Sequence, residues 1–105
     1  MNLVVSASED SVAELVKRIR THEGAIRAFG VARLSIFGSR ARGSAPPTSD
    51  LDLIAGFAKG RKGSYFDLAR VKLLLEDSLH VRVDILPESA ASGSVNRFGE
   101  SLRVF

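Results

Sequence analysis

Residues 37–53 read Phe-Gly-Ser-Arg-Ala-Arg-Gly-Ser-Ala-Pro-Pro-Thr-Ser-Asp-Leu-Asp-Leu, and this stretch decides the fold. A branched, apolar run ends at the Gly-Ser pair, and a second apolar run opens with two aspartates, Asp50 and Asp52, one residue apart. Short apolar runs that are rich in branched residues and bounded by glycines are typical of strands. We therefore expect strands over 31–37 and 51–57, joined by a polar loop whose two prolines keep it out of a helix or a central strand.

Helical patterns lie on both sides of these strands. Apolar residues recur at helical spacing over 9–22, behind an N-cap serine, with Gly24 as a candidate break and Gly30 as a candidate C-cap. The order of elements predicts an α/β (α+β) domain, with a small mixed sheet flanked by helices. The remaining expected elements are a helix over 65–79 with an apolar stripe of Phe66, Ala69, Leu73 and Leu74, a strand over 81–86 ended by Pro87, and a short helix over 95–102.

Length and composition limit the class of protein. The 105 residues are 45% apolar and 26% charged, which is typical of one soluble globular domain, so we expect a single domain over 1–105. No apolar run approaches the roughly 20 residues of a membrane span, and the first residues do not read as a signal peptide. We expect a cytoplasmic protein with no membrane contact. A net charge of +3 suits an anionic ligand but does not by itself indicate nucleic acid, since the basic residues are scattered.

The two aspartates at the start of the second strand indicate a metal site. Side chains alternate along a strand, so Asp50 and Asp52 point the same way. With no cysteine and two widely spaced histidines, the chain favours a hard cation such as Mg²⁺ held by carboxylates. Asp84, flanked by apolar residues in the third strand, is a third candidate, as a metal ligand or as a general base. In the alternative interpretation, Asp50 and Asp52 are solvated or pair with nearby arginines. Asp84 would then pair with Arg82 or with another surface arginine.

The Gly-Ser pair suits the phosphate side of the same site. Gly38 permits a close backbone approach, and Ser39 at the start of a helical turn offers a hydroxyl and aligned N–H groups to an anion. Arg42 adds positive charge against a triphosphate. A Gly-Ser pair alone is common in turns, so the signal lies in its spacing from the aspartates.

That spacing resembles a known signature. Gly38-Ser39, ten intervening residues and Asp50-Leu51-Asp52 look like the motif of the polymerase-beta-type nucleotidyltransferase superfamily. The fuller string is similar to its minimal nucleotidyltransferase (MNT) family, and most of all to MNT antitoxins paired with HEPN-domain ribonuclease toxins. The resemblance implies a polymerase-beta-like fold, with Gly38, Ser39 and Arg42 binding ATP.

The same resemblance implies that Asp50, Asp52 and Asp84 are catalytic and hold Mg²⁺. It further implies attack on the α-phosphate, release of pyrophosphate, and AMP left on a tyrosine hydroxyl of the HEPN toxin. The short chain leaves no room for an added substrate-binding domain, which favours an acceptor on another protein. Two alternatives remain: a non-catalytic antitoxin that neutralises its partner by binding, and a nucleotidyltransferase acting on a small molecule or an RNA end.

Overall fold

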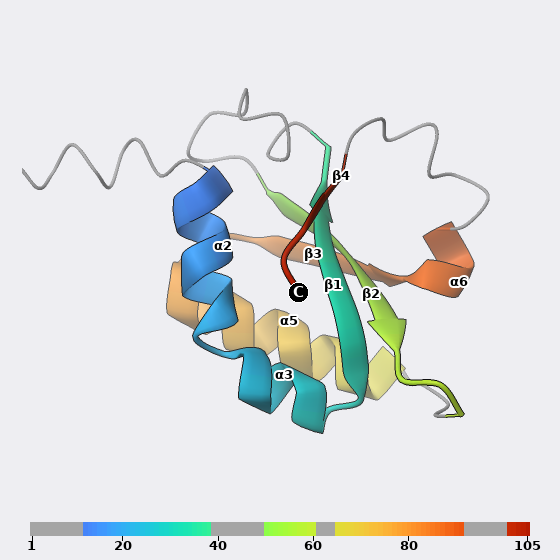
Figure 1. Ribbon diagram of the computed structural model, residues 1–105. Coiled ribbons are helices and arrows are strands. Elements are labelled where there is room, and N and C mark those ends of the chain that lie inside the picture. The colour runs from blue at the N-terminus through green and yellow to red at the C-terminus, as the bar shows by residue number, and fades with distance from the viewer. Residues whose placement is uncertain (1–11, 39–49, 61–64, 92–100) are drawn as a thin grey trace, which may run out of the picture.

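A mixed four-stranded sheet forms the centre of the computed structural model, which describes residues 12–38, 50–60, 65–91 and 101–105 (Figure 1). Strand β1 is antiparallel to both β2 and β4, whereas β2 and β3 run parallel. The predicted fold class is therefore confirmed. The strands, in the spatial order β3-β2-β1-β4, are β1 (Val31–Phe37), β2 (Leu51–Phe57), β3 (Val83–Pro87) and β4 (Ser101–Arg103).

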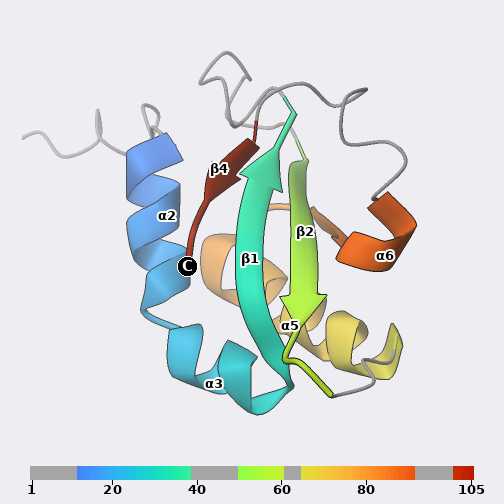
Figure 2. The same ribbon diagram turned by 45° about the vertical axis from the view of Figure 1, so that its right-hand side comes forward.

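Three of the helices in the described part of the chain share one hydrophobic core with this sheet, and Figure 2 shows the longest of them, α5, behind β1 and β2. They are α2 (Val12–Arg20), α3 (Glu23–Ala28) and α5 (Tyr65–Leu79), and a fourth, short helix, α6 (Glu88–Ala91), follows β3. None of the described helices is long and apolar enough to cross a membrane. The core takes at least one fully or nearly fully buried side chain from each of these three helices, for example Ile19, Ile26 and Leu75.

The two faces of the sheet differ because side chains alternate along each strand. In β2, Leu51, Leu53 and Ala55 are fully buried against the helices. Asp52 and Ile54 alternate with them, are only partly buried, and lie on the opposite face, which we call the open face. Among the described helices, α6 is the one that reaches this face, where Glu88 lies over Gly56.

The first predicted helix is divided in two, and its first residues, 9–11, lie outside the described part of the chain. The break falls at Thr21 and His22, not at Gly24, which lies inside α3. The Thr21 hydroxyl donates to the carbonyl of Arg18 at 2.6 Å, and the His22 N–H donates to the carbonyl of Ile19 at 2.9 Å, so the last turn tightens to three-residue spacing. The C-cap residue of α3 is Phe29, one residue before the expected Gly30, and Gly30 follows it with a left-handed φ of 101°.

Helix α5 has the predicted bounds but packs on a different stripe. Phe66 and Leu73, expected in the core, are 79% and 64% exposed, and Ala69 is exposed as well. Both sides of this helix carry apolar residues, so the spacing alone did not decide which side turns inward. The side that packs on the sheet carries Leu68, Val71, Leu75 and Leu79, with Leu74 partly buried at its margin.

The end of the chain also differs from the prediction. Ser101 and Leu102, expected to end a helix, belong to β4, and residues 95–100 of that expected helix lie outside the described ranges. Strand β4 pairs with β1, whose backbone groups on that edge would otherwise lack partners, and Val104 beyond it is 4% exposed in the core. The third strand begins at Val83 rather than Val81 and includes Pro87, which an edge strand such as β3 tolerates.

Candidate active site

Strand pairing brings two of the predicted acidic residues side by side. Asp52 on β2 is the register partner of Asp84 on the parallel strand β3, and of Phe37 on β1. Register partners project to the same face of a sheet, so both carboxylates lie on the open face. Asp50 is exposed and lies just before β2, two residues ahead of Asp52. Asp52 and Asp84 are therefore neighbours at the end of the sheet where β2 and β3 begin, and Asp50 lies just beyond that end.

The charge state of Asp52 reflects this crowding. Its pKa is raised from the ordinary carboxyl value, first by partial burial and then by repulsion from Asp84 and Asp50. Neither Asp52 nor Asp84 forms an ion pair within the described ranges, so no arginine there, Arg82 included, offsets the repulsion. The site thus holds negative charge that a bound cation would stabilise.

The turn that follows β1 approaches the same carboxylate. Gly38 has a φ of 81°, in the left-handed region that favours glycine. A Cβ placed on Gly38 would lie 3.4 Å from Oδ2 of Asp52, so backbone and carboxylate are already in close proximity. Gly38, predicted to approach the phosphates, and Asp52, predicted to bind the metal, are therefore close together in the structure. Ser39 and Arg42 lie outside the described residues, and their roles stay predictions.

A surface pocket of about 330 Å³ contains these groups. Asp52 and Asp84 supply its charge, Gly38 is at one side, and apolar side chains complete the wall. It is open to solvent and therefore accessible to a large ligand. Its lining residues are Phe37, Gly38, Asp52, Asp84, Ile85 and Leu86.

The donor set suits a hard divalent cation. Carboxylate oxygens are the ligands that Mg²⁺ prefers, and the pKa of Asp52 is raised by partial burial and then by the neighbouring charges of Asp84 and Asp50, a repulsion that a cation would offset. Among the described residues, however, no three acidic or histidine side chains converge closely enough to form a ready-made metal cage. Mg²⁺ commonly keeps several waters and takes substrate phosphates as further ligands, so one or two carboxylates are enough to hold it.

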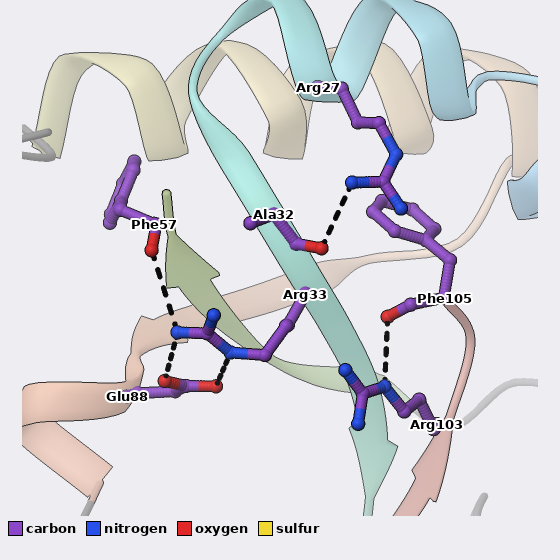
Figure 3. A network of polar contacts seen from close by, with 7 residues as sticks. All are labelled: Arg27, Ala32, Arg33, Phe57, Glu88, Arg103 and Phe105. Carbon is purple, nitrogen blue, oxygen red and sulfur yellow. Dashed lines mark hydrogen bonds and ion pairs between the residues drawn. The ribbon is translucent and has the colours of Figure 1, made fainter. Parts of the chain in front are cut away.

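An ion pair that was not predicted from the sequence lies at the far end of the open face (Figure 3). Arg33 of β1 donates to both carboxylate oxygens of Glu88, at 3.0 and 2.8 Å, and this pairing lowers the pKa of Glu88. The pair crosses β2 above Gly56, where a side chain would collide with both partners. The pair joins α6 to β1. It covers the open face at the end away from Asp52 and Asp84. A glycine in an otherwise apolar strand was the one sequence signal for such a crossing.

This fold and this acidic pocket define a nucleotidyltransferase domain. The chain belongs to the nucleotidyltransferase domain family, which it matches over residues 12–104. It is 47% identical over 57 residues to the "Putative protein adenylyltransferase MJ0435" of Methanocaldococcus jannaschii, an alignment that covers 54% of this chain and 59% of that relative. The chain thus spans little more than half the length of that relative.

Solved structures give the same result. A structure described as a "putative minimal nucleotidyltransferase" superposes with a TM-score of 0.63 and 41% identity, over 76% of this chain and 80% of that chain. The predicted resemblance to minimal nucleotidyltransferases is therefore confirmed. A "toxin-antitoxin with AMP-PNP" superposes with a TM-score of 0.66 over 83% of this chain and 72% of that chain, but at 15% identity, which shows a shared fold alone.

Proposed function

We propose that this protein is an adenylyltransferase that moves AMP from ATP to a hydroxyl group of a partner protein. One observation carries the proposal: Asp52 and Asp84 are register partners in a pocket that also contains the left-handed turn at Gly38. Carboxylates and a close backbone turn are the parts that phosphoryl-group chemistry needs, namely a cation site and a phosphate site. Membership of the nucleotidyltransferase domain family supports this assignment.

The transfer is a substitution at the α-phosphorus of ATP. The acceptor oxygen forms a bond to that phosphorus, and the bond to the bridging oxygen breaks, so pyrophosphate leaves with its electron pair. The acceptor proton passes to a carboxylate, a role that suits Asp84 because its side chain is exposed on the edge strand. Gly38, with Ser39 and Arg42, binds the triphosphate so that the α-phosphorus lies over Asp52.

Mg²⁺ would be held by Asp50 and Asp52, with Asp84 as a third acidic ligand, and when bound it neutralises charge on the phosphates. The pKa of Asp52 is raised by partial burial and then by repulsion from Asp84 and Asp50, and a cation would offset that repulsion, which supports this role. The carboxylates would hold the cation against the triphosphate, and Asp84 would accept the proton of the acceptor hydroxyl.

Outside the pocket, the acceptor class is supported by the name of one relative, the "Putative protein adenylyltransferase MJ0435". The structure of a toxin–antitoxin pair shares the fold and does not identify an acceptor. The resemblance to MNT antitoxins adds a tyrosine of a HEPN ribonuclease toxin as the acceptor. We propose this pairing for the present chain.

Nucleotide labelling tests the proposal. The purified protein is incubated with Mg²⁺, the partner protein, and ATP radiolabelled at either the α- or the γ-phosphate. AMP transfer labels the partner from α-labelled ATP alone, and mass spectrometry locates the modified residue. Asp50→Ala with Asp52→Ala should abolish labelling, whereas Asp77→Ala, an exposed residue of α5 outside the pocket, should not.

The same variants separate the alternatives. If the partner remains unlabelled and the Asp50/Asp52 double variant still neutralises it, the protein acts by binding alone. If label from ATP appears on a small molecule or on RNA instead of the partner, the acceptor class is wrong while nucleotidyl transfer stands. Label from γ-labelled ATP would identify a kinase and reject the proposal.

A further inference from the structure

Two of the three apolar residues that line the pocket, Ile85 and Leu86, belong to β3, and the third, Phe37, belongs to β1. Leu86 follows Asp84 by two residues on β3, so both side chains project to the open face, and both line the pocket. Leu86 is 38% exposed and is one of the large hydrophobic side chains that the described part of the protein leaves on its surface. Its register partner Ile54 is also only partly buried, and neither belongs to the hydrophobic core or packs against it.

The ends of this apolar surface are defined. Asp52 and Asp84 form one end, and the Arg33–Glu88 ion pair above Gly56 forms the other. Ile54 and Leu86 occupy the single row between these ends, and we call them the apolar shelf. The shelf borders the outer edge of the sheet, because β3 is an edge strand. A group that belongs to another polypeptide can therefore approach it from that side.

Substitution at phosphorus restricts which substrate can use the shelf. The attacking oxygen and the leaving pyrophosphate lie on opposite sides of the α-phosphorus. If the pyrophosphate is bound at Gly38, at the end of β1, the acceptor must come from the β3 side. Two strand spacings, roughly 10 Å, separate β1 from β3, which leaves room for the α-phosphorus between them. The shelf is therefore beside the acceptor and not beside the leaving group.

We infer that Leu86, with Ile54 beside it, is the specificity-determining contact for the acceptor and seats an aromatic ring whose hydroxyl reaches Asp84. This inference rests on the proposed function. Along a strand, two residues span about 6.6 Å, comparable with the reach of a phenol side chain from its Cβ to its oxygen. A ring on Leu86 thus presents its hydroxyl at Asp84, whereas a serine in the same place falls short and leaves the shelf exposed.

Steady-state kinetics test the inference with three variants of the full chain. Leu86→Ala should raise the KM for the partner protein about ten- to a hundredfold, the effect of losing roughly one buried leucine side chain, and leave the KM for ATP unchanged. Leu86→Met, which keeps an apolar side chain of similar volume, should retain most of the affinity. Leu102→Ala is the matched control: Leu102 is 36% exposed in β4 and does not line the pocket, so both KM values should stay as in the parent protein.

A second measurement uses peptides that span the labelled site of the partner, one with tyrosine and one with serine at the modified position. The parent protein should label the tyrosine peptide at least tenfold faster, and Leu86→Ala should reduce that preference. An unchanged partner KM in Leu86→Ala, with transfer intact, overturns the inference alone. A raised KM for ATP instead assigns the shelf to the adenine base and overturns it too. No transfer by the parent protein rejects the proposed function and this inference together.

Discussion

The charge of Asp52 lowers the stability of the folded protein at neutral pH, and replacing Asp52 by asparagine measures that cost. The pKa of Asp52 is raised in the folded protein by burial and by repulsion from Asp84 and Asp50. The folded chain therefore holds the Asp52 proton more tightly than the unfolded chain does. By linkage, stability falls as the pH rises through the ordinary carboxyl range and the raised folded value, and the full penalty applies at neutral pH. Asp52→Asn removes the charge and should stabilise the protein there.

The size of the stabilisation by Asp52→Asn can be calculated from the spacing between neighbouring strands, which separates Asp52 from Asp84. Neighbouring strands are about 4.8 Å apart, and two unit charges at that separation repel by roughly 0.9 kcal/mol in water. We use the value for water as the lower figure, because Asp84 is exposed although Asp52 is partly buried, and salt reduces the repulsion further. Asp52→Asn should therefore raise the free energy of unfolding by about 1 kcal/mol, or the Tm by about 4 °C for a domain of this size.

Thermal and urea unfolding of a double-mutant cycle provide the assay. Asp84→Asn should also stabilise, and the double variant should gain less than the two single gains combined, because both remove the same repulsion. Asp77→Asn, on the exposed side of α5, is the control and should add independently to Asp52→Asn. At about pH 3, where carboxylates are largely protonated, the difference should vanish. Destabilisation at about pH 7, or strict additivity with Asp84→Asn, would refute the electrostatic account.

Three further changes test other parts of the structure. Gly38→Ala places a side chain at φ 81° and 3.4 Å from Asp52, so it should cost about 1–2 kcal/mol in urea unfolding and weaken ATP binding in calorimetry; unaltered stability would contradict the strained turn. Leu53→Ala, at a fully buried position of β2, should cost about 3 kcal/mol, and a loss below about 1 kcal/mol would place Leu53 outside the core. Glu88→Gln should cost at most about 1 kcal/mol, because the pair with Arg33 is exposed. That loss should shrink as the pH falls through the lowered pKa of Glu88, and a pH-independent loss would argue against an ionic contribution.

Local patterns predicted most of the elements. The strands over 31–37 and 51–57 and the helix over 65–79 have the predicted bounds, and for the first strand the glycines on either side, Gly30 and Gly38, mark both ends. The inward side of α5 was wrong because Phe66 and Leu73 compete with Leu68 and Leu75 for the core, and tertiary packing alone selects between them. Strand β4 depends on pairing with the distant β1, a contact that no local spacing in its own three residues reveals.

The candidate site was predictable to the extent that it lies within one motif. Asp50, Asp52 and Gly38 were all predicted from the single stretch 37–53. Pairing of β1 with β2 is enough to bring Gly38 close to Asp52. Asp84 needed the further assumption that the third strand lies beside the second, which parallel pairing confirms. The Arg33–Glu88 pair could not be foreseen, because it depends on a short helix after Pro87 and on the missing side chain at Gly56.

Strand β4 has a consequence for how the protein folds and associates. Ser35 pairs with Arg103, a residue far along the chain, so the entropy of closing this edge must be overcome by the three exposed residues of β4, the buried Val104, and Phe105, whose backbone hydrogen-bonds to Leu34. We expect β4 to be the last strand to dock and the first to detach. Whenever it detaches, β1 presents a bare edge to which the same strand of a second molecule can pair, in competition with its own strand. Strand exchange through β4 is therefore the expected route to dimers at high protein concentration.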